Sequence, residues 1–134
     1  MEMLDDTLGN VTARSPIIRS DPVGPSQRHY ANAALLLDSV LSPAELLHCL
    51  QRTEAAFGRI RLGQRWRARV LDLDIIMWSG GIYATKELLI PHPRFRERGF
   101  VLGPAAKIAP DWRDPVSGRT LRQLAALFAR RGQV

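Results

Sequence analysis

The chain has 134 residues and 46% hydrophobic content, which suits one domain with a packed core and excludes a wholly disordered chain. No apolar run approaches the roughly 20 residues that a transmembrane helix needs. The 19 basic and 13 acidic residues leave a net charge of +6, and every basic residue except Lys86 and Lys107 is an arginine, whose planar fork matches pairs of phosphate oxygens.

The first third of the chain is expected to pair two extended segments. After a helical tail over Met1–Gly9, the pattern predicts an edge strand at Val11–Ile18 and a second strand at Tyr30–Asp38. Turn-forming residues between them predict a loop at Ser20–His29.

A long amphipathic helix follows. The spacing of its leucines predicts a helix over Ser42–Phe57, with Ser42 as N-cap, Glu45 completing a capping box and Gly58 ending it. The next residues, Arg59–Arg69, show no regular period and are expected to form a loop.

The second half interleaves short strands with two helices. Strands are predicted at Val70–Trp78, near Ile82–Tyr83 and at Glu87–Ile90, and helices at Phe100–Ile108 and Thr120–Arg131. No repeat or linker interrupts the pattern, so we expect a single α+β domain over residues 1–134.

Two aspartates interrupt an otherwise apolar strand. In a strand, alternate residues share a face, so Leu71, Leu73 and Ile75 would face the core while Asp72 and Asp74 stand together about 6–7 Å apart on the other side. Such a pair either holds magnesium ions, which favour carboxylate and phosphate oxygens, or forms a solvated face paired with nearby arginines.

A basic segment next to the pair favours the first interpretation. No acidic residue separates Glu54 from Asp72, and five arginines fall between them: Arg59, Arg61, Arg65, Arg67 and Arg69. A second basic cluster, Arg94, Arg96 and Arg98, follows His92. Paired acids beside such segments are suited to a magnesium-bound polyphosphate. Trp66 either packs over a base or anchors its loop, and no P-loop motif is present.

Several stretches match one family's pattern, in the same order, over Arg14–Phe128. They are Tyr30–Ala34, Gly58–Arg59, the run R-W-x-x-R-x-L-D-L-D-I at Arg65–Ile75, Pro91–Pro93, Arg98–Pro104 and Ile108–Pro110. This combination resembles the 6-hydroxymethyl-7,8-dihydropterin pyrophosphokinase family of folate biosynthesis.

The resemblance implies a fold and an activity. The fold would be a ferredoxin-like α/β sandwich with a mainly antiparallel sheet. The activity would be transfer of the terminal pyrophosphate of ATP to the pterin hydroxymethyl oxygen, giving AMP and the pterin diphosphate. ATP would be the co-substrate, and two Mg²⁺ ions would be held by Asp72 and Asp74.

The resemblance also implies roles for individual residues. The catalytic set would be Arg59, Arg61, Arg69, Asp72 and Asp74. ATP would be bound by Gln51, Glu54, Arg59, Arg61, Trp66, Arg69, Ile75, His92 and Arg98. The pterin would be bound by Val23, Tyr30, Asn32 and Phe100.

The chain departs from the family's pattern in two places. The family usually has Gly-Pro where this chain has Arg67 and Ala68, and the family's first strand and Gly-Ser-Asn turn are not found before Met1. We therefore expect an N-terminally truncated domain. This leaves two alternatives to the enzyme: a non-catalytic remnant that binds ATP or pterin, and a basic nucleic-acid-binding module.

Small molecules are the expected partners. We expect ATP and the hydroxymethyl dihydropterin to bind a monomer that uses neither nucleic acid nor a membrane. The single cysteine, Cys49, excludes an internal disulfide, and no secretory signal pattern is seen, so a cytoplasmic location is expected.

Overall fold

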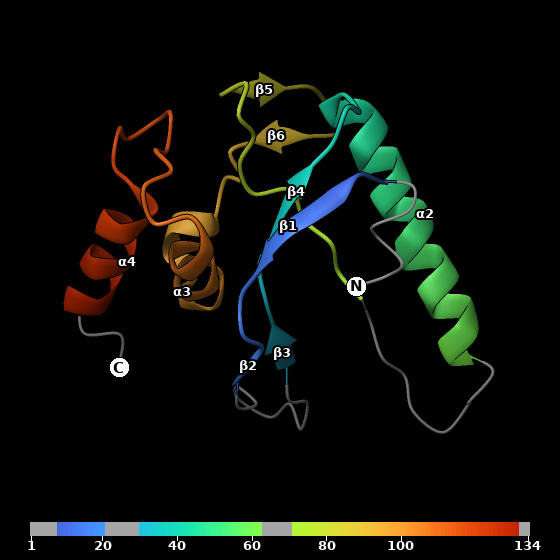
Figure 1. Cartoon of the computed structure of the whole chain (residues 1–134), viewed down its shortest axis with the longest axis horizontal. Helices are drawn as coiled ribbons and strands as arrows, with labels where there is room; N and C mark the ends of the chain where they lie inside the picture. The colour runs from blue at the N-terminus through green and yellow to red at the C-terminus, as the bar shows by residue number, and fades with distance from the viewer. Residues whose placement is uncertain (1–7, 21–29, 63–70, 132–134) are drawn as a thin grey trace.

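A computed structural model describes residues 8–20, 30–62 and 71–131 of the chain (Figure 1). Short strands come first, followed by one long helix, a small hairpin and two further helices. In chain order the elements are β1 (Asn10–Arg14), β2 (Ile18–Ser20), β3 (Tyr30–Asn32), β4 (Leu35–Asp38), α2 (Pro43–Leu62), β5 (Tyr83–Ala84), β6 (Leu89–Ile90), the 3₁₀ helix η1 (Phe95–Glu97), α3 (Gly99–Ile108) and α4 (Leu121–Arg130).

The first four strands form one interrupted antiparallel ribbon. β1 pairs with β4, and β2 pairs with β3. At the interruption, the buried Ser15 accepts a hydrogen bond from the Ala34 N–H through its Oγ at 2.8 Å, and the Ser15 N–H donates to the Ala34 carbonyl at 2.9 Å. The Ser15 side chain thus replaces a ladder bond where the two strand pairs meet.

The two long strands predicted here are therefore each divided. Val11–Ile18 becomes β1 and the start of β2, because Pro16 has no N–H to give to a ladder. Tyr30–Asp38 becomes β3 and β4, since the Ala34 N–H bonds to a side chain.

Helix α2 begins as predicted and ends later. The Ser42 N–H donates to Glu45 Oε1 at 2.8 Å and the Glu45 N–H donates to Ser42 Oγ at 3.2 Å, which confirms the capping box. The predicted end at Gly58 is wrong, because α2 continues to Leu62. A glycine inside a helix costs only about 1 kcal/mol relative to alanine, and the residues after it are adequate helix formers. Arg59 and Arg61 therefore lie on the last turn of α2 and not in a loop.

Residues 71–78 differ from the strand predicted at Val70–Trp78. In the described part of the chain they belong to no strand ladder. Their backbone groups bond elsewhere: the Leu73 N–H donates to the Glu54 carboxylate, and the Ile76 carbonyl accepts from the His92 N–H. Backbone polar groups satisfied in this way do not need a neighbouring strand.

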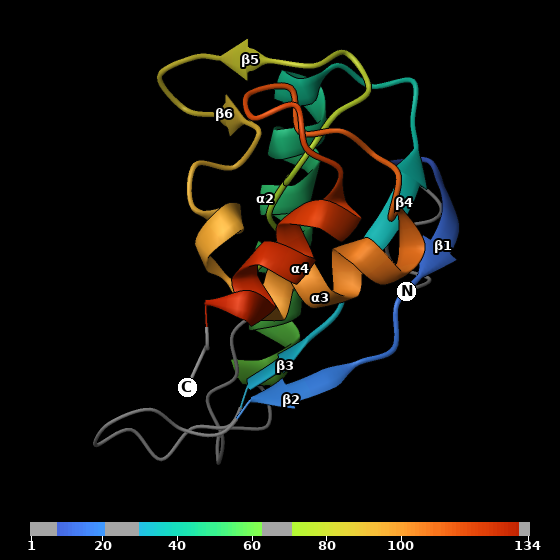
Figure 2. The same ribbon diagram turned by 90° about the vertical axis from the view of Figure 1, so that its left-hand side faces the viewer.

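Helices lie on both sides of the ribbon (Figure 1). One apolar cluster joins Leu50 and Leu46 of α2 to Leu8 and Leu37, together with Leu73. In Figure 2, α3 and α4 cover the front of the molecule and α2 lies behind them.

A second apolar cluster lies beneath α3 and α4. It joins Phe95, Leu102, Leu121 and Leu124, and Met77 packs against it. Residues 73–77 thus contribute side chains to both clusters.

The fold class is α+β, as predicted, and the three strand pairs found among the described residues are all antiparallel. The ferredoxin-like sandwich and the missing first strand stay predictions. Among the described helices, none combines the length and the apolar character that crossing a membrane requires.

We expect Ser15→Ala to lower the free energy of unfolding by about 1–3 kcal/mol, because it leaves the Ala34 N–H without its acceptor at a buried junction. Urea unfolding followed by circular dichroism would measure the change, with Ser79→Ala as the control at an exposed turn. Equal stability of the two variants would contradict the role given to Ser15.

Candidate active site

Asp72 and Asp74 point away from the core. Both are exposed, whereas Leu71 and Leu73 are half-buried, which is the alternation that the sequence predicted even though no ladder forms. Leu73 and Ile75 pack in the α2 cluster, so the apolar residues between the aspartates fix the side from which the carboxylates project.

Helix α2 holds the backbone between the two aspartates. Glu54 Oε2 accepts a hydrogen bond from the Leu73 N–H at 2.6 Å. A charge-assisted bond of this length restrains the peptide strongly. Glu54 thus positions the two aspartates by holding the main chain between them.

The turn after β6 is bonded to the same segment. The His92 N–H donates to the Ile76 carbonyl at 2.9 Å, and the Arg94 N–H donates to His92 Nδ1 at 3.1 Å. Because Nδ1 accepts, the proton of the neutral imidazole lies on Nε2. His92 can therefore offer an N–H donor to an anion.

The electrostatic surroundings of His92 show which charged groups lie near it. Burial lowers the pKa of His92 below its usual 6.5, the negative charge of Asp74 opposes this, and Arg98 and Arg94 lower it further. One acidic and two basic groups thus lie close enough to this imidazole to act on it. At pH 7 the ring is neutral.

Arg98 connects this turn to the start of α3. Its guanidinium carbon lies 5.8 Å from the centre of the Phe100 ring, within the range of a cation–π contact. Phe100 itself is 40% exposed, which leaves ring surface available to a planar ligand.

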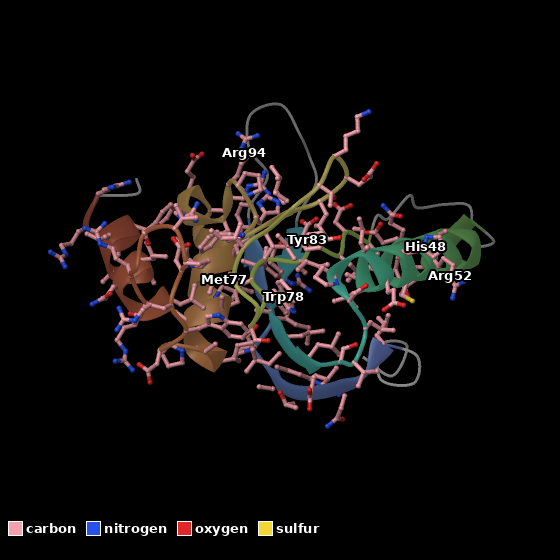
Figure 3. All side chains as sticks on the ribbon, turned by 90° about the horizontal axis from the view of Figure 1, so that it is seen from above. His48, Arg52, Met77, Trp78, Tyr83 and Arg94 are labelled. Atoms are coloured by element: carbon pink, nitrogen blue, oxygen red, sulfur yellow. The ribbon has the colours of Figure 1, made fainter. Side chains whose placement is uncertain are left out.

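A hollow of about 310 Å³ lies between α2 and the β5–β6 hairpin. Gln51 and His48 of α2 and Tyr83 and Glu87 of the hairpin are among its lining residues, and Figure 3 labels His48 and Tyr83. Trp78 supports the hairpin, with its ring 6.1 Å from that of Tyr83 at 89°. Gln51 lies one turn before Glu54 on the same side of α2, so α2 carries both a residue of the hollow and the carboxylate that binds the Leu73 N–H.

The two carboxylates of Asp72 and Asp74 suit a magnesium ion that is also bound by a phosphate substrate. They do not suit a metal ion that is coordinated by protein side chains alone. Within the described ranges, no group of three or more His, Cys, Asp or Glu side chains could hold a metal ion. Mg²⁺ commonly binds through one or two carboxylates and completes its coordination with water and substrate phosphates. Asp72 and Asp74, exposed and adjacent, supply such a pair.

Comparison with known proteins identifies the family. The family model described as 7,8-dihydro-6-hydroxymethylpterin-pyrophosphokinase (HPPK) matches residues 1–110. The chain belongs to this family. Three of the proteins similar to this chain are named 2-amino-4-hydroxy-6-hydroxymethyldihydropteridine pyrophosphokinase.

These relatives match most of this chain. The Synechocystis sp. protein is 49% identical over 106 residues, 79% of this chain and 54% of its own. The proteins from Methylorubrum extorquens and Pseudomonas aeruginosa are each 41% identical, over 87% and 93% of this chain. The chain thus spans about half of the first relative's length and 72% and 75% of the other two.

The structure brings together one group of the HPPK residues predicted from sequence. Asp74 and Arg98 act electrostatically on His92, and Arg98 lies against Phe100. Glu54 bonds to the Leu73 N–H, between Asp72 and Asp74.

The remaining predicted residues either have other described positions or lie outside the described residues. Asn32 lies on β3, and Ile75 packs in the α2 cluster. Val23, Trp66 and Arg69 lie outside the described residues, as do the side chains of Tyr30, Arg59 and Arg61.

Sequence reasoning missed two features of the site. The first is Arg94, which it grouped only as a basic residue and which here bonds to His92 through its N–H. The second is that Arg96, grouped from sequence with Arg94 and Arg98, pairs with Asp114. The turn-forming run Asp-Pro-Val-Ser-Gly was the available signal for a buried, capping Asp114.

We expect His92 to titrate below pH 6.5 in metal-free protein without nucleotide. Asp74→Asn should lower its pKa further, because Asp74 favours the protonated ring, and Arg98→Ala should raise it. The proton NMR signal of the ring, assigned with a His92→Gln variant, would be followed against pH. A midpoint above 6.5, or a rise in Asp74→Asn, would refute this picture of the site.

Proposed function

We propose that this chain transfers the terminal pyrophosphate of ATP to the hydroxymethyl oxygen of 6-hydroxymethyl-7,8-dihydropterin. In this reaction the substrate hydroxyl oxygen attacks the β-phosphorus, and the bond from that phosphorus to the α,β-bridging oxygen breaks. AMP leaves, and the hydroxyl proton is released. The observation that carries the proposal is the convergence of an exposed aspartate pair with His92 and Arg98 in a chain of the HPPK family.

The proposed ATP site has two parts. The hollow beside Gln51 would take the adenosine, and the triphosphate would extend along α2 toward Asp72 and Asp74. Magnesium, two ions by the family resemblance, would be held by these carboxylates and would neutralise phosphate charge. Ile75 would contribute its backbone only, because its side chain is packed in the core.

Cationic and donor groups would hold the triphosphate from the other side. His92 would donate from Nε2, and Arg98 would place its guanidinium on a phosphate oxygen. Arg59, Arg61, Arg69 and Trp66 belong to the proposal through the resemblance. No protein nucleophile is assigned, since phosphoryl-type transfer depends on positioning and charge neutralisation.

The proposed pterin site lies at the start of α3. The exposed face of Phe100 would stack on the pterin, with Tyr30 as the second ring, while Asn32 would bond its polar edge and Val23 would contact it. Because Arg98 lies against Phe100, the two substrates would meet at this contact.

The direct test is to incubate the protein with ATP, MgCl₂ and the hydroxymethyl dihydropterin and to separate the nucleotides. AMP should accumulate together with the pterin diphosphate, and omission of the pterin or addition of EDTA should stop it. Formation of ADP in place of AMP, or no AMP from folded protein, would refute the proposal.

We expect Asp72→Asn and Asp74→Asn each to reduce AMP formation by about 10³-fold or more, because each removes charge that would hold the metal–phosphate complex. Their melting temperatures should stay close to that of the parent, since both side chains are exposed. Asp111→Asn is the matched control, an exposed aspartate in the loop after α3. Marked unfolding of either site variant would indicate a structural role.

A further inference from the structure

Among the described residues, the carboxylate of Asp114 is completely buried and hydrogen-bonded through both oxygens. Asp114 has no exposed surface. Its Oδ2 accepts a hydrogen bond from Arg96 Nε at 2.6 Å, and its Oδ1 accepts one from Arg96 Nη2 at 2.8 Å. The two residues thus form a bidentate ion pair. Ser117 Oγ donates to the same carboxylate at 2.7 Å and the Val116 N–H at 3.0 Å.

Arg96 occupies the middle of the turn that carries the proposed phosphate ligands. It lies in η1, with Arg94 before this 3₁₀ helix and Arg98 after it. A 3₁₀ helix has three residues per turn, so alternate residues point in different directions. Arg96 is thereby directed to Asp114, while Arg94 and Arg98 are left on the side of His92.

The other end of the ion pair is rigidly held. Asp114 lies in the loop before α4, where its N–H donates to the Arg119 carbonyl and its carbonyl accepts from the Gly118 N–H, both at 2.8 Å. Gly118 has a φ of +77°, which favours glycine, and Thr120 then caps α4. The loop is therefore a fixed anchor for the turn.

A second anchor holds the same turn from beneath. Phe95 has no exposed surface and packs with Leu102 and Leu121, and the Arg96 guanidinium carbon lies 4.6 Å from the centre of the Phe95 ring. The apolar anchor fixes the depth of the turn, and the planar fork fixes its rotation, because a bidentate pair has only one good geometry.

We infer that Asp114 is a positioning residue for this enzyme: by holding Arg96 it sets the orientation of the turn that presents His92 and Arg98 to the triphosphate. The inference rests on the proposed function. Asp114 lies beyond residue 110, where the family model ends, so the role belongs to the C-terminal part of this chain. The pair also removes one of three closely spaced positive charges from the phosphate-binding side.

The experiment compares Asp114→Asn and Arg96→Lys with the parent, and Arg122→Ala is the matched control. Arg122 forms an ion pair with Asp111 at 3.3 Å, but the side chains of both residues are largely exposed. Lysine at position 96 keeps the charge and loses the fork, so it separates orientation from charge balance. Activity is measured at a temperature where thermal scans show each variant fully folded.

Both site variants should lower kcat/KM for ATP by about tenfold or more, because small displacements of positioned groups reduce rates strongly. The KM for the pterin should stay within about twofold, and Arg122→Ala should match the parent. The inference would be overturned if folded Asp114→Asn or folded Arg96→Lys had the parental kcat/KM for ATP. The ion pair would then have a purely structural role.

A readout independent of turnover separates this inference from the proposed function. The His92 ring signals in nucleotide-free protein should shift in Asp114→Asn and Arg96→Lys and stay in place in Arg122→Ala. If the parent makes no AMP, the proposed function fails, and these signals alone decide the positioning role. Unmoved His92 signals in both variants would overturn it.

Discussion

Residues 73–77 must satisfy two apolar clusters at once, and this constraint places the site. Leu73 and Ile75 enter the cluster beneath α2, whereas Ile76 and Met77 pack against the cluster beneath α3 and α4. A segment divided in this way can neither rotate nor slide without exposing apolar surface, at a cost of about 25 cal/mol per Å². Asp72, just before this segment, and Asp74, within it, are therefore directed outward. The hydrogen bonds to Glu54 of α2 and from His92 use backbone groups that would otherwise bond to a neighbouring strand.

The distribution of charge follows from this arrangement. Asp74 faces His92 with Arg94 and Arg98 nearby, so the site contains both signs of charge before any ligand binds. In the complex we propose, a polyphosphate with its metal ions would replace these interactions with stronger ones of the same kind, metal with carboxylate and phosphate with guanidinium. Burial lowers the pKa of His92 and so favours the neutral ring, which is a hydrogen-bond donor and not another competing cation.

Local signals in the sequence predicted local structure well. The capping box at Ser42 and Glu45, and the alternation that exposes Asp72 and Asp74, depend on residues a few positions apart, and both are confirmed. The division of the ribbon at Ser15 and the ion pair between Arg96 and Asp114 could not be predicted in this way. Their partners lie 19 and 18 residues apart, and no periodic pattern encodes such a contact. The predicted end of α2 at Gly58 is wrong because glycine, although common just after a helix, does not end one by itself. The residues that follow it continue α2 to Leu62.

The packing of η1 against α3 and α4 explains how the proposed site would depend on residues that touch no substrate. Phe95 and Arg96 are consecutive, and one enters the core beneath α3 and α4 while the other reaches the loop before α4. The turn between His92 and Arg98 is therefore held both by packing against α3 and α4 and by the ion pair to Asp114. A buried ion pair adds little net stability compared with apolar residues of equal size, because both charges must be desolvated. At a turn with three arginines, the role we infer for the pair is therefore one of direction, since the fork would decide which guanidinium groups are left to meet phosphate.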